Sequence, residues 1–298
     1  MVNTEYNYQT NLFKHISHYS EQKKIDFIAI DINTNLACGG WWVDFPPYGY
    51  GEFNLPQIYL PYLSGIELNA YCEGELISTS IYQWKKSDNR FKFSTPKNEL
   101  SYGSWHSLVY DDEYNSNFLP TDVVYDLGAN FGVYTMWANY YKVSQIYAFE
   151  PTPKNVECLK ETFKWDNNIQ IIEKAIFNKN EIRKFYTYEH SVGNSLNYDN
   201  SENNIEVECI NLEQYINENN LLPPTIIKCD IEGSEYEFLE SCSDKFFDSV
   251  KTLIVEFHLN FENRVWFIIS RLLNLGYNIK MSPNNYTTGE MGTILALK

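Results

Sequence analysis

Two patterns of hydrophobic and polar positions divide the chain. From about residue 25 to 116, short runs of aromatic and β-branched residues are separated by Gly, Pro, Asn and Asp. Ile66, Leu68 and Ala70 show the two-residue period of a half-buried strand. These runs predict a small antiparallel sandwich or curled sheet. Residues 1–20 lack this period and are predicted to be weakly helical or irregular.

From residue 121 onward, strand-like runs alternate with helix-like runs. Strands are predicted at 122–126, 145–149, 169–176, 183–188, 205–210, 225–230, 251–257, 277–281 and 292–297. Helices are predicted near 131–141, 153–164, 212–219, 233–240 and 261–275. Such alternation is typical of a mostly parallel sheet with helices on both faces. With a linker at 111–122, we expect a β-rich accessory domain at 1–118 and an α/β domain at 119–298.

The most informative motif is VVYDLGANFG, which occupies residues 123–132. It is typical of an apolar strand, a turn of small residues and the start of a helix, and the next strand, QIYAFEP, ends in Glu150. Gly128 and Gly132 let the backbone approach a ligand closely. An acid at the tip of the second strand can accept hydrogen bonds from two ribose hydroxyls. The motif therefore predicts a nucleoside-binding crevice.

The glycine loop that binds a pyrophosphate is missing from this motif. Ala129, Asn130 and Phe131 stand where such a loop would need glycine. A nicotinamide-dependent dehydrogenase is therefore disfavoured. A ligand with a ribose but no phosphate fits better, and S-adenosylmethionine is the obvious one.

A second strand-turn-helix motif, TIIKCDIEGSEYEFL, occupies residues 225–239. It gathers Lys228, Asp230, Glu232 and Glu235 at one strand tip, where Lys228 and Asp230 share a face by the two-residue period. Since open α/β sheets bind ligands outside the carboxyl ends of their strands, this tip should border the crevice. For Glu235, a helix-capping role is an equally good interpretation.

A third strand, TLIVEFH, ends in Glu256 and His258, which share a face. A lone histidine is more often structural than catalytic. Here it follows two acidic strand tips, so we weigh the two roles equally.

Taken in order, DLGANFG with YAFEP, then IIKCDIEGSE, then VEFH closely resemble the FkbM-type family of S-adenosylmethionine-dependent methyltransferases. The resemblance covers roughly residues 120–297, and residues 1–118 resemble no family that we recognise. It implies a class I methyltransferase domain, with a Rossmann-like doubly wound sheet and a C-terminal β-hairpin, preceded by the small sandwich-like β domain. It also implies O-methylation, often of sugar hydroxyls on glycans, antibiotics or polyketide-derived compounds.

The resemblance further implies which positions meet the cofactor and which meet the reacting centre. Residues near S-adenosylmethionine would be Asp126, Gly128, Ala129, Asn130, Gly132, Glu150, Glu173 and Ala175. Of these, Glu150 would hold the ribose and the segment from Glu173 to Ala175 would border the adenine. Residues at the reacting centre would be Lys228, Asp230, Glu232 and His258.

Methyl transfer to a hydroxyl needs a positioned acceptor and a group that takes its proton. His258 or Asp230 is the expected base. Asp230 and Glu256 could instead hold a hard divalent ion such as Mg²⁺ through carboxylate oxygens. Lys228 could equally neutralise the acids without a metal. The sequence leaves these alternatives open.

Charge and cysteine usage narrow the partners and the compartment. The net charge is -16, and both halves are acidic, which argues against nucleic acid as the main partner. No run of about 18 apolar residues predicts a membrane span, and the first residues lack the apolar centre of a secretory signal. The six cysteines show no metal-ligand spacing. Cys158, Cys209 and Cys229 look like small buried apolar residues in a reducing compartment, and a Cys38–Cys72 disulfide is a minor alternative. We therefore expect a cytoplasmic protein.

Other function classes are weaker. A non-catalytic glycan- or protein-binding module built on a methyltransferase fold is the main alternative, and the presence of Glu150, Asp230 and Glu256 weighs against it. A methyltransferase acting on nucleic acid is disfavoured by the acidity, and no Asn/Asp-Pro-Pro-Tyr-like base-methylation motif follows Asp230.

The N-terminal half holds four of the seven tryptophans, at Trp41, Trp42, Trp84 and Trp105. In a strand, Trp41 and Trp42 point to opposite faces, so one of them can be exposed. Exposed rings beside acids and amides suit stacking on sugars. From sequence alone we favour an aromatic core or the interface of a homo-oligomer.

Overall fold

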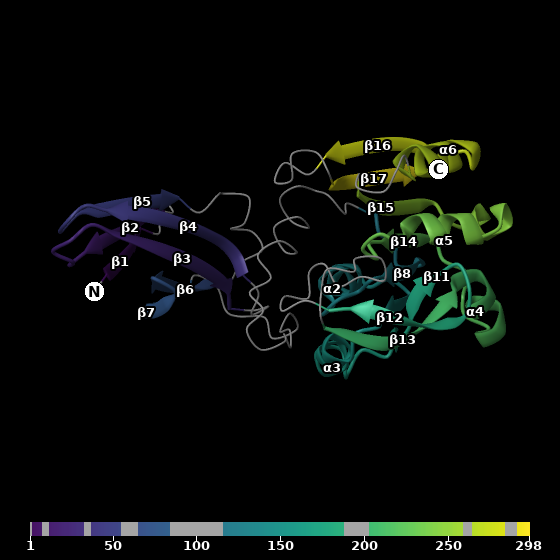
Figure 1. Ribbon diagram of the computed structural model, residues 1–298, viewed down its shortest axis with the longest axis horizontal. Helices are drawn as coiled ribbons and strands as arrows, with labels where there is room; N and C mark the ends of the chain where they lie inside the picture. The colour runs from purple at the N-terminus through teal and green to yellow at the C-terminus, as the bar shows by residue number, and fades with distance from the viewer. Residues whose placement is uncertain are drawn as a thin grey trace. The chain divides into compact units, whose positions relative to one another are not determined.

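The computed structural model describes residues 2–7, 12–32, 37–54, 65–83, 116–187, 203–258, 264–283 and 291–298. The chain divides into two compact units, residues 1–112 and 113–298. Each unit is described by itself, with the element labels of Figure 1.

The N-terminal unit is built from two antiparallel sheets. One sheet has the order β1 (Val2–Asn7), β2 (Leu12–Ser17), β5 (Tyr50–Asn54). The other has the order β4 (Ala37–Phe45), β3 (Lys23–Asp31), β6 (Gly65–Cys72), β7 (Glu75–Gln83). The predicted antiparallel β character is confirmed. The part of the predicted β region from residue 84 to 115, which includes Trp84 and Trp105, lies outside the described residues.

The prediction for residues 1–20 is wrong, because this segment contains β1 and β2. β1 pairs in register with β2, and β2 pairs with β5 on its other side. These backbone hydrogen bonds stabilise strands that the local sequence does not favour on its own. On β2 the buried positions are Phe13, His15 and Ser17. Two of these three residues are polar, so the buried side of β2 does not appear as alternating hydrophobic residues in the sequence.

The core of this unit surrounds a buried histidine. His15 stacks on Phe27 of β3, with ring centroids 3.7 Å apart. Trp41 Nε1 donates a hydrogen bond to His15 Nε2 (3.1 Å), while Nδ1 and Thr4 Oγ1 lie 3.0 Å apart. Because Nε2 is an acceptor, the ring is neutral and carries its proton on Nδ1. Burial lowers the pKa of His15 from 6.5 to about 4.

The adjacent tryptophans of β4 point to opposite faces, as predicted. Trp41 packs into the core, whereas Trp42 is 65% exposed.

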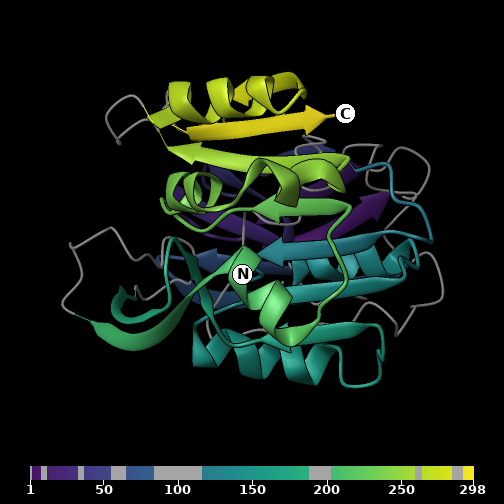
Figure 2. The same cartoon turned by 90° about the vertical axis from the view of Figure 1, so that its right-hand side faces the viewer.

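The C-terminal unit is centred on a seven-stranded sheet. Its order is β10 (Ile169–Ile172), β9 (Gln145–Phe149), β8 (Val123–Leu127), β14 (Ile226–Cys229), β15 (Thr252–His258), β17 (Met291–Leu297), β16 (Asn278–Pro283). Strands β10, β9, β8, β14 and β15 are parallel, and β17 is antiparallel to both of its neighbours. This doubly wound sheet with a closing hairpin is the class I methyltransferase arrangement expected above (Figure 2).

Alternation along the strands places helices on both faces. Tyr125 and Leu127 belong to a core cluster that includes residues of the three helices α4 (Leu212–Asn219), α5 (Glu235–Ser241) and α6 (Arg264–Asn274). Asp126 points the other way and receives a hydrogen bond from Thr135 of α2 (Val133–Tyr140). Helix α3 (Pro153–Thr162) follows β9, and a short 3-10 helix, η2, spans Asp244–Asp248.

The strand predicted at 169–176 is instead two strands in two sheets. β10 ends at Ile172, and a turn with a hydrogen bond from Lys174 N to Ile172 O (2.9 Å) leads into β11 (Ala175–Phe177). β11 joins a separate sheet of order β11, β13 (Asn204–Asn211), β12 (Glu181–Tyr186). The polar pair Glu173–Lys174 lies at this turn, but the apolar residues on both sides of it made the segment read as one strand.

Cysteines fill apolar positions, as expected from their neighbours. Cys158, Cys209, Cys229 and Cys242 are buried free thiols, and Cys72 is a free thiol as well, so it forms no disulfide with Cys38. Among the described residues, no helix has the length and apolar character needed to cross a membrane.

Gly128 stands where the ends of β8 and β14 come together. Its φ is +76°, and a Cβ at this position would lie 1.8 Å from the carbonyl oxygen of Asp230. The carbonyl of Phe149 accepts hydrogen bonds from the N–H groups of both Gly128 and Ala129 (3.0 and 2.9 Å). The turn is thus anchored to β9 on one side and packed against the second motif on the other, and only glycine fits.

We expect Gly128→Ala to destabilise the C-terminal unit more than Gly276→Ala, measured by urea unfolding. Both glycines have positive φ, +76° and +85°, but a Cβ at Gly276 would have nothing within 4 Å. Gly276→Ala should therefore lose only the left-handed backbone term, about 1–2 kcal/mol, whereas Gly128→Ala adds an overpacking cost of about 1–3 kcal/mol. Equal losses would contradict the close approach of the two loops.

We also expect the stability of the N-terminal unit to fall between pH 6.5 and pH 4 because of His15. Its pKa in the folded state, about 4, lies below the ordinary histidine value of 6.5. As the pH falls, the unfolded chain therefore takes up the proton first, and a contribution approaching about 3 kcal/mol is lost by pH 4. Unfolding free energies across this range should fall more steeply for the wild type than for the non-titrating His15→Gln. Parallel curves would rule out this linkage.

Candidate functional site

The carboxyl ends of β8, β14 and β15 bring the acids of the separate motifs together. β8 and β14 pair so that Asp126 lies opposite Lys228, and β14 and β15 pair so that Lys228 lies opposite Ile254. Two residues further along the same register, Asp230 lies beside Glu256. By alternation these four ionisable side chains share one face of the sheet.

Lys228 connects the two turns. Its side chain is buried, and Nζ lies 3.4 Å from both Asp126 Oδ1 and Asp230 Oδ2. It also donates a hydrogen bond to the carbonyl oxygen of Gly128 (2.8 Å). Burial lowers the pKa of Lys228, but Asp230, Asp126 and Glu256 outweigh burial and raise it overall. Because the ammonium keeps its charge at neutral pH, it positions its neighbours and does not act as a base.

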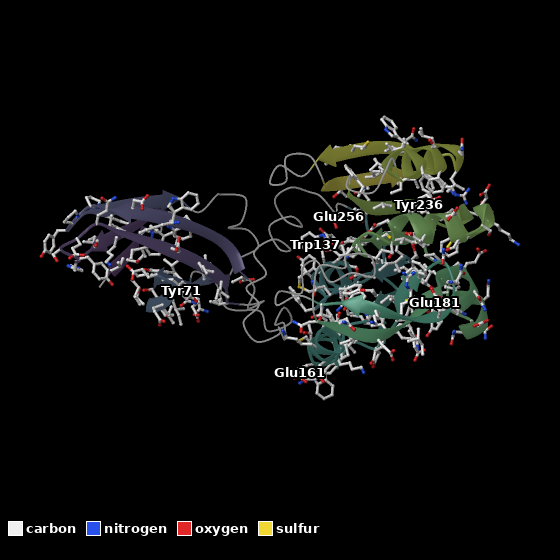
Figure 3. The ribbon with its side chains drawn as sticks, in the orientation of Figure 1. Tyr71, Trp137, Glu161, Glu181, Tyr236 and Glu256 are labelled. Carbon is white, nitrogen blue, oxygen red and sulfur yellow. The ribbon has the colours of Figure 1, made fainter. Side chains whose placement is uncertain are left out.

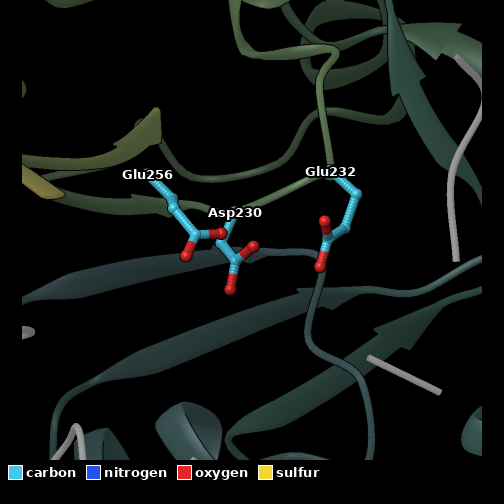
Figure 4. A group of neighbouring side chains, drawn as sticks. All are labelled: Asp230, Glu232 and Glu256. Atoms are coloured by element: carbon cyan, nitrogen blue, oxygen red, sulfur yellow. The ribbon is translucent and has the colours of Figure 1, made fainter. Parts of the chain in front are cut away.

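Three carboxylates converge beside this lysine. Asp230, Glu232 and Glu256 each offer an oxygen, and these atoms all lie within 4.8 Å of one another (Figure 4). Burial, reinforced by Asp230 and Glu232, raises the pKa of Glu256 well above the usual range, and Glu256 shares a hydrogen bond with Asp230. Either a proton held on Glu256 or a cation bound among the three oxygens would relieve their repulsion.

Glu235 shapes the loop that presents these acids. Its carboxylate accepts hydrogen bonds from the N–H groups of Ile231 (3.0 Å) and Gly233 (3.0 Å). This holds Glu232 and Gly233 in the left-handed region, with φ of +52° and +99°. Glu235 therefore acts as a loop-organising residue, in line with its capping interpretation.

Glu150 occupies the tip of β9 as the first motif predicted. Its side chain is buried, and Oε2 accepts a hydrogen bond from Asn130 N (2.9 Å) while Oε1 accepts one from Thr152 N (2.8 Å). Burial raises the pKa of Glu150, and the hydrogen bonds from Thr152, Asn130 and Asn155 oppose that effect. The carboxylate is thereby fixed against the 128–132 turn, with lone pairs left for a further donor.

Gly132 begins α2 with a φ of +100°. A Cβ there would lie 2.6 Å from Phe163 Cε2 and 2.7 Å from Leu159 Cδ2. The glycine thus lets α2 pack closely against α3. Ala129 is buried within the same turn, and Asn130 also adopts a positive φ, of +52°.

Three predicted positions remain, Glu173, Ala175 and His258. Glu173 is an exposed residue just beyond β10, next to Ile172, whose carbonyl oxygen accepts a hydrogen bond from Glu150 N (3.1 Å), and it forms an ion pair with Lys160 of α3. Ala175 is buried at the start of β11 in the small sheet. His258 is the last residue of β15, and its side chain lies outside the described part of the chain.

Sequence reasoning missed three supporting residues. Thr135 donates a hydrogen bond to Asp126 Oδ2 (2.6 Å), and Thr152 and Asn155 support Glu150 through Oε1. Thr135 could have been noticed as a hydroxyl in an otherwise apolar and aromatic helix. Thr152 and Asn155 look like ordinary N-terminal helix residues in the sequence and give no separate signal.

Comparison with known proteins places this site in context. "Methyltransferase 1" of Beauveria bassiana is 22% identical over 196 residues, which cover 57% of this chain and 79% of that protein. A precorrin-6y C5,15-methyltransferase from Geobacter metallireducens superposes with a TM-score of 0.43 at 13% identity, over 69% of this chain and 94% of that one. Fibrillarin of Aeropyrum pernix, in complex with S-adenosyl-L-methionine, gives a TM-score of 0.43 at 12% identity, over 79% and 95%.

The family model described as the methyltransferase FkbM domain matches residues 126–279. That span is more than half of the chain and runs from Asp126 through β9, both motif turns and the acids at the ends of β14 and β15. The chain therefore belongs to the FkbM family of methyltransferases.

Proposed function

We propose that this chain is an S-adenosylmethionine-dependent O-methyltransferase that acts on a hydroxyl group of a sugar, either in a nucleotide sugar or in a glycan. Membership of the methyltransferase family supports the transfer of a methyl group. The single observation that carries the cofactor assignment is the buried carboxylate of Glu150, fixed at the tip of β9 against the glycine turn.

The residues of the first motif fit a nucleoside with a cationic side chain. Glu150 would accept the ribose hydroxyls, and Gly128 lets the turn pack directly against the second motif at Asp230. The carboxylates of Asp126 and Asp230 supply negative charge near the place where a sulfonium would lie. When bound, S-adenosylmethionine would supply the methyl group as an electrophile, so the chain need not generate one.

The chain's own task is to hold the acceptor and take its proton. In the displacement the acceptor oxygen forms the new O–C bond while the S–C bond breaks, and the hydroxyl proton leaves to a base. We assign the role of base to the carboxylate of Asp230. This side chain is partly exposed, lies 3.4 Å from Lys228 Nζ and offers an oxygen within 4.8 Å of one from Glu256. His258 remains the alternative base proposed from sequence.

A sugar hydroxyl suits this group of acids. Carboxylates accept hydrogen bonds from neighbouring hydroxyls, so Glu232 and Glu256 could orient a polyhydroxylated acceptor while Asp230 takes the proton. A phosphate-rich acceptor such as RNA would meet these carboxylates and a chain of net charge -16.

We expect Glu150→Gln to weaken binding of S-adenosylmethionine and S-adenosylhomocysteine by about 10- to 100-fold, which is about 1.5–3 kcal/mol for charge-assisted hydrogen bonds. Calorimetric titration measures this directly. The matched control is Glu157→Gln on α3, an exposed carboxylate that should leave affinity unchanged. Equal affinities for the wild type and Glu150→Gln would refute the ribose assignment, and no binding to the wild type would refute the methyltransferase proposal itself.

We expect Asp230→Asn to retain cofactor affinity within a few-fold and to lose methyl transfer, because the amide cannot accept the acceptor's proton. Wild-type turnover on a responsive sugar acceptor should persist after treatment with EDTA. The alternative, a Mg²⁺ ion held by Asp230, Glu232 and Glu256, predicts that EDTA abolishes turnover and that added Mg²⁺ restores it. Methyl transfer by Asp230→Asn at the wild-type rate would exclude Asp230 from both roles.

A further inference from the structure

The four-stranded sheet of the N-terminal unit has one face in the core and one face outward. On β3 and β6, Phe27, Leu68 and Ala70 are buried, so this side of the sheet packs inward. The alternate positions form the outer face. It carries the polar and aromatic residues Lys24, Asp26, Trp42, Asp44, Glu67, Asn69, Tyr71 and Thr79, together with Ile28, Ile30 and Ile81. Trp42 is 65% exposed and Tyr71 partly exposed on this face (Figure 3 labels Tyr71).

The register aligns the two aromatic residues in one row across the strands. Trp42 of β4 lies opposite Asp26 of β3, and Asp26 lies opposite Tyr71 of β6. The two aromatic residues are therefore two strand spacings apart, about 10 Å. Tyr71 in turn lies opposite the exposed Leu76 of β7, so the row continues to the edge of the sheet.

Charged groups surround the exposed tryptophan. Asp44 follows Trp42 on the same face of β4, and Gly40, two residues before it, adds no side chain there. Lys24 Nζ lies 5.3 Å from the centre of the Trp42 ring and 3.7 Å from Asp26 Oδ1. The ammonium of Lys24 therefore lies over one face of the Trp42 ring, and the carboxylates of Asp26 and Asp44 lie beside the ring on the same side of the sheet.

A second row of polar side chains is held in place by hydrogen bonds. Asn69 Nδ2 donates to Glu67 Oε1 (2.9 Å), and Thr79 Oγ1 donates to Asn69 Oδ1. Asn69 is nearly buried by these partners, whereas Thr79 is exposed and Glu67 partly so. The hydroxyl of Thr79 is therefore fixed in the row next to the aromatic row, and the carboxylate of Glu67 is fixed in the row after that.

From this arrangement we propose that the outer face is a binding platform for a neutral oligosaccharide. The C–H faces of sugar rings would stack on Trp42 and Tyr71, and sugar hydroxyls would pair with Asp26, Asp44, Glu67 and Thr79. Aromatic residues provide contact area at a small cost in side-chain entropy, while charged acceptors form the stronger hydrogen bonds.

The charge of the outer face favours a neutral oligosaccharide over a second copy of the chain, a polyanion or an anionic membrane. The face carries three carboxylates, Asp26, Asp44 and Glu67, against the one ammonium of Lys24. A second copy docked through the same face would oppose two such acidic surfaces, and a polyanion or an anionic membrane would be repelled. A neutral polyhydroxylated chain meets no such repulsion. This proposal concerns a second site and does not depend on the methyltransferase activity.

The test is retention of the full-length protein on an array of neutral glycans that includes maltotriose, cellotriose and tri-N-acetylchitotriose. We expect the wild type to retain a subset of these and Trp42→Ala to lose at least about tenfold in affinity for that subset, as for loss of a stacking contact worth about 1.4 kcal/mol. Asp26→Asn should weaken the same glycans without affecting folding, because Asp26 is exposed.

The matched control is Trp165→Ala in the other unit. Trp165 is 83% exposed and has Lys164 Nζ 5.9 Å from its ring centre, as Trp42 has Lys24, but it belongs to no such row. Glycan retention equal in the wild type and Trp42→Ala, or no neutral glycan retained by the wild type, would overturn the proposal. A dimer in light scattering that Trp42→Ala disrupts would assign the face to self-association instead.

The test of glycan binding can be distinguished from the test of the proposed cofactor site. Trp42→Ala should bind S-adenosylmethionine as the wild type does, and Glu150→Gln should retain the glycans. Loss of both properties in Trp42→Ala would point to a folding defect, which circular dichroism of that variant would reveal, and Asp26→Asn would then decide the matter.

Discussion

The buried ammonium of Lys228 is the interaction on which the arrangement of the site depends. It is paired with an acid from each of two separate motifs and with a carbonyl of the glycine turn. Removing it would leave the buried carboxylate of Asp126 uncompensated, and breaking a buried ion pair in this way costs about 3–5 kcal/mol. Because Lys228 is on the central strand β14, it fixes the distance between Asp126 and Asp230 before any ligand arrives. The acids around Lys228 are therefore held in place by the fold itself and not by a ligand.

The two motif turns share one design. Each follows a parallel strand, each contains a non-glycine residue at positive φ, Asn130 or Glu232, and each is held by a carboxylate that accepts backbone N–H groups. Glu150 holds the first turn and Glu235 the second. An acid in the sequence can therefore serve either the ligand or the loop, and only geometry distinguishes the two. The buried, strand-tip position of Glu150 allows it to do both, whereas Glu235 is committed to the backbone.

Much of the α/β unit could be predicted because local pattern and tertiary structure agree there. The apolar strands β8, β9, β14 and β15 end in the acids that the sequence placed at their tips, and α4 spans the predicted residues 212–219.

The wrong predictions occurred where the pairing between strands decides the structure and the local hydrophobic pattern does not. β1 and β2 depend on one another and on β5, with His15 and Ser17 disguising the buried side of β2. The division of 169–176 into β10 and β11 depends on which strand each half pairs with. The supporting roles of Thr135 and Asn155 depend on how α2 and α3 turn back against the strands that precede them, which the sequence pattern does not specify.

The small sheet of β11, β13 and β12 has two faces with different constraints. Ile176 and Ile210 pack into the main core, whereas Phe177, Phe185 and Val207 form a separate cluster on the other side. Both sets of side chains are buried, so a substitution at Ile176 or Ile210 has to be compensated within the main core, whereas one at Phe177, Phe185 or Val207 can be compensated within the small sheet. Compensating changes in related chains should therefore alternate between two different cores, residue by residue, along β11 and β13.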